Sequence, residues 1–283
     1  MKISTKTITR VAIFGSISAL LYCFLKFPLP FFLSFYELNF SDVPALIGGF
    51  AFGPLAGSLI QVVKVVVKLL FVGTSTSYVG EFSDLLLGIV MVLPASLYYK
   101  YHRNIKGAII GSIISAVTNV ILGAFTNYFI LLPFYGELFF KNGISDLINM
   151  IINAYPSFSI NETNALWMCI LICTIPFNAI KNTIIVILTF ILYKRLGYFI
   201  KYIEKKTNID NSYVDSNPLS IIKIVSILIV IFSLIGSILR FINKDIVLGF
   251  IFLGIAILFI IVLYLIKYFI NKNNKEIKKW RNI

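Results

Sequence analysis

Polar side chains that could bind a small molecule stand at two places in otherwise apolar segments. Asn178 and Lys181 lie three residues apart, so on a helix they share one face. Asn127 stands beside Tyr128 and Phe129. An amide next to aromatic rings suits a flat heteroaromatic ligand, because the rings can stack on it while the amide bonds its edge. Two alternatives stay open: a lysine that extends to the membrane interface, and asparagines that cap a helix or bond a neighbouring one.

Charged side chains form a second group of candidates. Glu81 and Asp84 follow a Gly-, Ser- and Thr-rich loop, at the start of a predicted helix, where the helix dipole favours negative charge. Glu81 is a candidate for the mouth of a binding site. Two carboxylates within reach of each other also raise an enzyme interpretation, with acid–base chemistry on lipid, although no nucleophile or set of metal ligands accompanies them. Lys64 and Lys68 either face water or extend to the interface, and no ligand is assigned to them.

Composition limits the class of protein that can carry these residues. The chain has 283 residues, 59% of them hydrophobic, with a mean hydropathy of +0.92, which predicts an integral membrane protein. The formal net charge is +13, but the basic residues cluster between apolar segments, which indicates membrane topology rather than nucleic-acid binding. The one histidine, His102, cannot assemble a His-based metal site. No G-x-x-x-x-G-K-[ST] motif is present, so ATP hydrolysis by that route is not expected.

The apolar segments predict an all-helical membrane bundle. The predicted spans cover about 8–27, 55–72, 82–99, 107–132 and 165–193, with a short element at 43–52. Ten residues are half of the ~20 that a simple span needs. This short element is Gly-rich and ends at Gly53-Pro54. Irregular backbone is tolerated in lipid where it lines a site, so the element predicts a polar cavity nearby. Residues 134–164 are predicted to be a long connector with some amphipathic character.

The segment after residue 206 is predicted to be accessory. Residues 207–218 form a polar linker, and two further spans at about 219–239 and 246–268 precede a basic tail. The predicted domains are therefore 1–206, the linker 207–218, and a helical hairpin with its tail at 219–283. Basic residues are concentrated in the two terminal segments and in alternate connectors between spans. This predicts a multi-pass plasma-membrane protein with both termini in the cytoplasm and the loops 28–41, 73–81 and 133–164 outside.

Small residues form a stripe on the first predicted span, at Ala12, Gly15, Ser16 and Ala19. Such spacing lets another helix approach closely, either from a partner subunit or from the same bundle.

Four segments together resemble the S component, the substrate-binding subunit, of an energy-coupling factor (ECF) transporter, and in particular its riboflavin-specific members. They are SDVPALIGGFAFGPLAG at 41–57, GTST at 73–76 with VGE at 79–81, NYF at 127–129 with LLP at 131–133, and IPFNAIK at 175–181. The resemblance covers about residues 6–197.

The resemblance implies a six-helix bundle with one outward vitamin pocket, capped by the loop between the first two helices; the two spans after residue 207 are additional. It implies three partners, a transmembrane coupling subunit and two cytosolic ATPases, and no enzymatic activity of its own. Riboflavin would be a transported ligand rather than a cofactor. The resemblance implies that Asn178, Lys181 and Asn127 bind riboflavin. It also implies that Ala12-xxx-Ser16 or Gly15-xxx-Ala19 contacts the coupling subunit. Open alternatives are another vitamin or precursor, such as thiamine or a flavin nucleotide, and a structural or regulatory membrane subunit.

Overall fold

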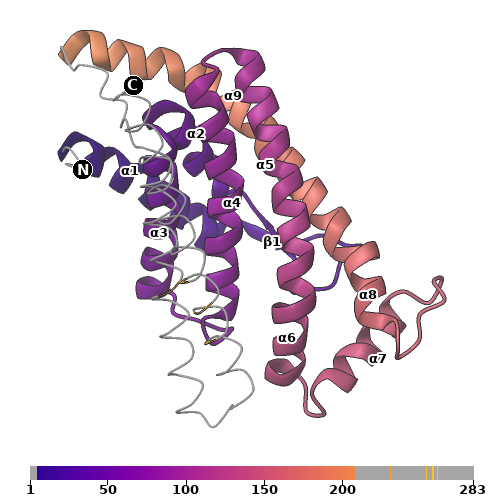
Figure 1. Cartoon of the computed structure of the whole chain (residues 1–283). Coiled ribbons are helices and arrows are strands. Elements are labelled where there is room, and N and C mark those ends of the chain that lie inside the picture. The colour runs from indigo at the N-terminus through magenta and orange to yellow at the C-terminus, as the bar shows by residue number, and fades with distance from the viewer. Residues whose placement is uncertain (1–4, 208–229, 231–252, 254–256, 258–259, 261–283) are drawn as a thin grey trace, which may run out of the picture. The chain divides into compact units, whose positions relative to one another are not determined.

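The computed structural model describes residues 5–207 and the isolated positions 230, 253, 257 and 260 (Figure 1). The chain divides into two units, Met1–Ser216 and Asn217–Ile283, and the fold described below belongs to the first. The predicted linker and C-terminal hairpin lie outside the described residues, apart from Thr207 and the four isolated positions.

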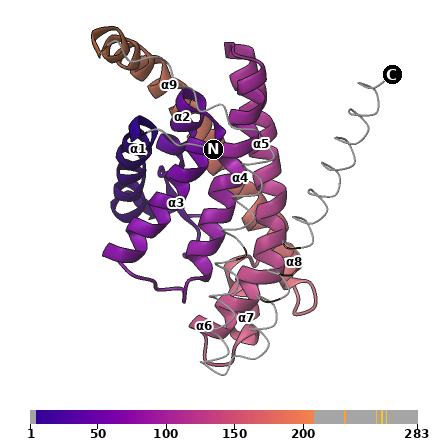
Figure 2. The same ribbon diagram turned by 60° about the vertical axis from the view of Figure 1, so that its left-hand side comes forward.

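The described part is a helical bundle whose long helices match the predicted spans. They are α1 (Thr5–Phe24), α3 (Pro54–Phe71), α4 (Val79–Tyr101), α5 (Ile105–Thr126) and α9 (Ile175–Thr207), with the short α2 (Asp42–Phe52). Five helical segments of the described part are long and apolar enough to cross a membrane. The membrane-bundle prediction is thus confirmed, whereas a count of six spanning helices plus two is not established. Helix α5 packs against both α4 and α9 (Figure 2).

Proline explains why two of these helices widen. A π-helical segment, η1 (Asn127–Leu131), joins α5 to α6 (Leu132–Phe139), and a second, η2 (Ile170–Thr174), joins α8 (Ala165–Cys169) to α9. Pro133 and Pro176 follow these segments, and the carbonyls four residues earlier, at Phe129 and Ile172, lie inside them. Proline has no N–H for that carbonyl and its ring crowds it, so a wider turn relieves the conflict. The two π segments contact each other.

The Gly-rich element α2 is a packing element. Ten of its eleven residues are buried, and it ends where Gly53, at φ +102°, separates it from α3. A Cβ on Gly57 of α3 would lie 2.8 Å from the Gly49 Cα and 2.5 Å from Val92 Cγ1 of α4. Glycine therefore lets three helices pack closely. The element does not itself line the cavity described below, because its small apolar residues are used for helix contact.

The predicted connector at 134–164 is largely helical. It contains the end of α6 and all of α7 (Ile144–Ala154), whose Leu147 and Ile151 are buried in one apolar cluster with Cys169 and Cys173. The buried residues of α7 lie on one face, which agrees with the amphipathic character predicted for this connector, and that face packs against α8 and η2.

The loop before α2 contains the only strands of the described residues. β1 (Lys26–Pro28) pairs antiparallel with β2 (Glu37–Asn39), with Lys26 opposite Asn39 and Pro28 opposite Glu37. The Lys26 ammonium lies 2.7 Å from the Glu37 carboxylate. This small hairpin is the one departure from an all-helical fold in that part of the chain.

The stripe of small residues on α1 is divided between two surfaces. Gly15 and Ala19 are buried, and a Cβ on Gly15 would lie 2.5 Å from Val63 Cγ1 of α3. Ala12 and Ser16 are exposed. Only these last two are accessible to a partner; Gly15 and Ala19 instead let α1 approach α3.

Candidate ligand-binding site

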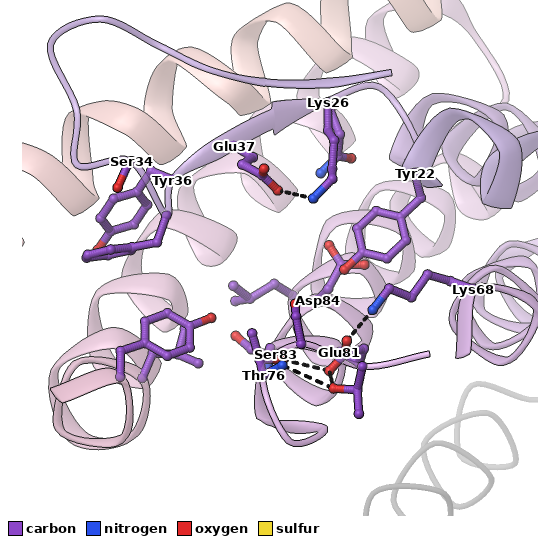
Figure 3. A pocket seen from close by; sticks show the side chains of 18 of the residues that line it. Tyr22, Lys26, Ser34, Tyr36, Glu37, Lys68, Thr76, Glu81, Ser83 and Asp84 are labelled. Carbon is purple, nitrogen blue, oxygen red and sulfur yellow. Dashed lines mark hydrogen bonds and ion pairs between the residues drawn. The ribbon is translucent and has the colours of Figure 1, made fainter. Parts of the chain in front are cut away.

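A cavity of about 430 Å³ opens between the hairpin, the loop after α3, and helices α1, α4, α6 and α9 (Figure 3). Its volume lies in the range of ~300–1,000 Å³ that is usual for small-molecule sites. The four predicted ligand-binding residues, Asn127, Asn178, Lys181 and Glu81, all line it. They come from η1, α9 and α4, so the fold brings together residues up to a hundred positions apart in the sequence.

One wall of the cavity carries the two amides. Asn127 and Asn178 are 4% and 6% exposed. The Nδ2 of Asn127 donates to Gly123 O at 2.8 Å, and the Nδ2 of Asn178 donates to Thr174 O at 2.9 Å. Each bond fixes the orientation of an amide and uses one of its two N–H groups, so the other N–H remains for a ligand.

Tyr36, from the loop between the strands, joins this wall. Its hydroxyl donates to Asn127 Oδ1 at 2.9 Å and lies 2.6 Å from Thr174 Oγ1. Since the single phenolic hydrogen is given to Asn127, the Thr174 hydroxyl is the donor in the second bond. Thr174 ends η2 and Asn127 begins η1, so this one side chain ties the loop to both widened helical turns.

Glu81 of α4 also lines the cavity, and it is 2% exposed. Its carboxylate accepts hydrogen bonds from Lys68, from Thr74 Oγ1 at 3.0 Å and from Thr76 Oγ1 at 2.8 Å (Figure 3). Thr74 and Thr76 belong to the Gly-, Ser- and Thr-rich loop that follows α3. The hydroxyl groups of this loop therefore hold the Glu81 carboxylate in place at the cavity wall.

A chain of charges runs from Asp84 and Lys181 at the cavity wall to Lys64 and Asp42 behind it. Lys64 is fully buried, and its ammonium lies 3.0 Å from Asp42 Oδ1 and 2.6 Å from Asp84 Oδ2. The other oxygen of Asp42 lies 3.6 Å from the Lys181 ammonium. Unpaired charge inside a membrane is unfavourable, so pairing is what permits these residues at depth.

The two lysines differ in their outcome. Lys64 is fully buried and does not face water, contrary to the prediction. Lys68 lines the cavity, in agreement with one of the two predicted alternatives, and bonds Glu81 there. Their carboxylate partners could not be assigned from spacing, because the partners come from other helices. The same contacts separate Glu81 from Asp84: each carboxylate is directed to a different lysine, which does not support the acid–base pair of the enzyme interpretation.

Aromatic side chains line the cavity beyond the amides, and only part of this was predicted. Phe177 of α9 lies 5.1 Å from the Tyr36 ring, and Tyr135 of α6 lies 5.4 Å from Phe35, measured between ring centroids. Tyr22 of α1 also lines the cavity. The signal in the sequence was the Phe- and Tyr-rich loop at 28–41. With the amides, the ammonium and the carboxylate, these rings suit a flat, polar, uncharged ligand.

Comparison with known proteins identifies the architecture. Residues 6–193 match the family described as "ECF transporter, substrate-specific component". The chain belongs to this family. Among curated relatives, the riboflavin transporter RibU of Staphylococcus aureus (strain TCH60) is 35% identical over 204 residues, which is 71% of this chain and 97% of RibU. The riboflavin transporter FmnP of Bacillus subtilis (strain 168) is 26% identical over 197 residues, which is 69% of this chain and 94% of FmnP.

A solved structure supports the assignment of the fold. The structure of the S component of a bacterial ECF transporter aligns with this chain with a TM-score of 0.52 and 33% identity. The alignment covers 69% of this chain and 98% of that one. The family resemblance seen in the sequence is therefore confirmed, and the chain is a multi-pass membrane S component.

Proposed function

We propose that this chain is the substrate-binding membrane subunit of an ATP-driven vitamin transporter, and that its substrate is riboflavin. The observation that carries the proposal is that Asn127, Asn178, Lys181 and Glu81 line one cavity of about 430 Å³. The names of the two curated relatives support riboflavin as the substrate.

The chemistry of the cavity fits the two parts of riboflavin. The isoalloxazine ring is flat and has carbonyl and imino groups along one edge, which the amides of Asn127 and Asn178 can bond in either sense. The aromatic rings of Tyr36 and Phe177 offer apolar faces for the ring system. Lys181 donates charge-assisted hydrogen bonds to ring acceptors, and Glu81 accepts them from ribityl hydroxyls.

The transport step would use partners. Riboflavin enters the cavity from outside and the loop at 28–41 closes over it. A coupling subunit and two cytosolic ATPases then drive its release into the cytoplasm. The exposed Ala12 and Ser16 of α1 form the contact with the coupling subunit. Both termini lie in the cytoplasm, in line with the basic residues that flank the spans. The chain itself performs no reaction and holds no resident cofactor.

A competition series on the detergent-purified protein tests the substrate. Tritiated riboflavin is bound to the purified protein, and unlabelled riboflavin, flavin mononucleotide, thiamine and biotin are each added to displace it. We expect saturable binding of the tritiated vitamin, which unlabelled riboflavin displaces at the lowest concentration. Stronger competition by thiamine or by the nucleotide would move the assignment to that vitamin or precursor. No binding of any of them would favour a structural or regulatory membrane subunit.

A further inference from the structure

Asp42 lies behind the ligand-binding cavity rather than in it. It is the first residue of α2, and its side chain is 5% exposed. Its neighbours come from two other helices: Lys64 and Gln61 from α3, and Lys181 from α9. Lys181 is the one of these three that also lines the cavity.

The two oxygens of Asp42 have separate partners. Oδ1 accepts hydrogen bonds from Lys64 Nζ at 3.0 Å and from Gln61 Nε2 at 2.9 Å. Gln61 Nε2 is also 3.3 Å from Gly88 O, so the amide is fixed between α3 and α4. These bonds hold the carboxylate in one orientation, in which Oδ2 faces the Lys181 ammonium at 3.6 Å.

The distribution of charge shows which partner depends on Asp42. Lys64 has a second carboxylate, Asp84, at 2.6 Å. Among the contacts of the described residues, Asp42 is the only carboxylate paired with Lys181. If the charge of Asp42 is removed, Lys64 keeps a counter-ion and Lys181 loses one. The long lysine side chain is flexible, so an ammonium without a partner has no fixed position at the cavity wall.

We propose that Asp42 is a positioning residue for the ligand-binding site: its Oδ2 holds the Lys181 ammonium where it meets the ligand, while α3 fixes its Oδ1. This inference rests on the proposed function, because the contact of Lys181 with riboflavin is part of it. The competing explanation is that Asp42 only neutralises Lys64 and the amino end of α2, and so stabilises the fold without regard to Lys181.

A double-mutant cycle on the full chain separates the two explanations. Riboflavin affinity is measured by fluorescence quenching for the unchanged protein, Asp42→Asn, Lys181→Gln and the double variant. Glutamine keeps a hydrogen-bond donor at position 181, which retains measurable binding, but it has no charge for Asp42 to hold. Asp42→Asn is expected to weaken binding by ~10-fold or more in the unchanged background, as is usual when one partner of a buried charge pair is removed. In the Lys181→Gln background it changes the affinity by less than about 2-fold, because the coupled partner is gone.

An equal loss of affinity in both backgrounds overturns the proposal, because Asp42 would then act independently of Lys181. If Asp42→Asn is not monodisperse, Asp42→Glu keeps a charge for Lys64 but displaces the carboxylate by one methylene. Lys181→Gln is then expected to reduce affinity less in the Asp42→Glu protein than in the unchanged chain, and an equal reduction overturns the proposal. Failure of the unchanged chain to bind riboflavin would instead remove the proposed function.

Discussion

Replacing Asn178 by alanine is expected to weaken riboflavin binding, whereas the same change at Asn182 is expected to reduce stability alone. The two amides lie one turn apart on α9, which makes them a matched pair. Asn178 lines the cavity, and Asn182 does not. Asn182 is 2% exposed and donates to Asn119 Oδ1 at 3.0 Å and to Ala116 O at 3.3 Å, both on α5.

The magnitudes follow from the bonds that each change removes. Asn178→Ala removes one or two hydrogen bonds to a neutral ring, each contributing about 0.5–1.5 kcal/mol, so the dissociation constant should rise ~10-fold. Asn182→Ala leaves Asn119 Oδ1 buried without its partner, which should lower the free energy of unfolding by about 1–3 kcal/mol. Asn119 still donates to Leu87 O of α4 at 2.7 Å, so α5 keeps its contact with α4.

Two measurements on each variant test this reasoning. Riboflavin affinity is obtained by fluorescence quenching, and stability by thermal unfolding in the same detergent without ligand. The expected result is a loss of affinity in Asn178→Ala and a lower midpoint of unfolding with unchanged affinity in Asn182→Ala. An equal loss of affinity in both variants would show that α9 acts through packing. Unchanged affinity in Asn178→Ala, together with unchanged affinity in Lys181→Ala, would remove the assignment of the site.

Three further predictions concern packing, partner contact and orientation. Gly57→Ala should destabilise the bundle by about 1–3 kcal/mol, seen as a lower midpoint of thermal unfolding, because the added Cβ meets backbone that cannot move aside; an unchanged midpoint would contradict the close packing of α2 and α3. Ala12→Trp should prevent co-purification with the coupling subunit and leave riboflavin binding intact. Ile113→Trp, at an exposed site on α5, should leave both co-purification and binding intact. Equal effects of the two variants on co-purification would remove α1 as the contact. Single cysteines at exposed positions 75 and 102 test the orientation in intact cells, with Cys23 changed to serine in both proteins. Ser75→Cys should react with an impermeant maleimide, and His102→Cys should not. The reverse labelling pattern would invert the proposed orientation.

Much of the fold could be predicted because membrane spans are recorded in local sequence. Long apolar runs mark α1, α3, α4, α5 and α9, and the Gly53-Pro54 pair marks the end of α2 within one residue. Both signals act over a few neighbouring positions. The widened turns η1 and η2 could not be predicted in the same way, because a π segment leaves no separate periodicity, although Pro133 and Pro176 indicate where the helices are disturbed.

The candidate site could be predicted from the sequence only where a single polar residue stands in an apolar span. An asparagine or lysine within an apolar span is unfavourable unless it has a partner, so Asn178 and Lys181 stood out. Which partners they have depends on tertiary contacts. Tyr36 of the loop between the strands reaches Asn127, and Asp42 of α2 reaches Lys181. No spacing rule connects residues that are ninety or more positions apart, so these pairings required the structure.

An absorbance spectrum of the detergent-purified protein shows whether this chain binds riboflavin. From cells supplied with riboflavin, we expect a yellow preparation whose flavin bands correspond to about one equivalent bound in the cavity. A colourless preparation that also fails to quench the fluorescence of added riboflavin would contradict this expectation.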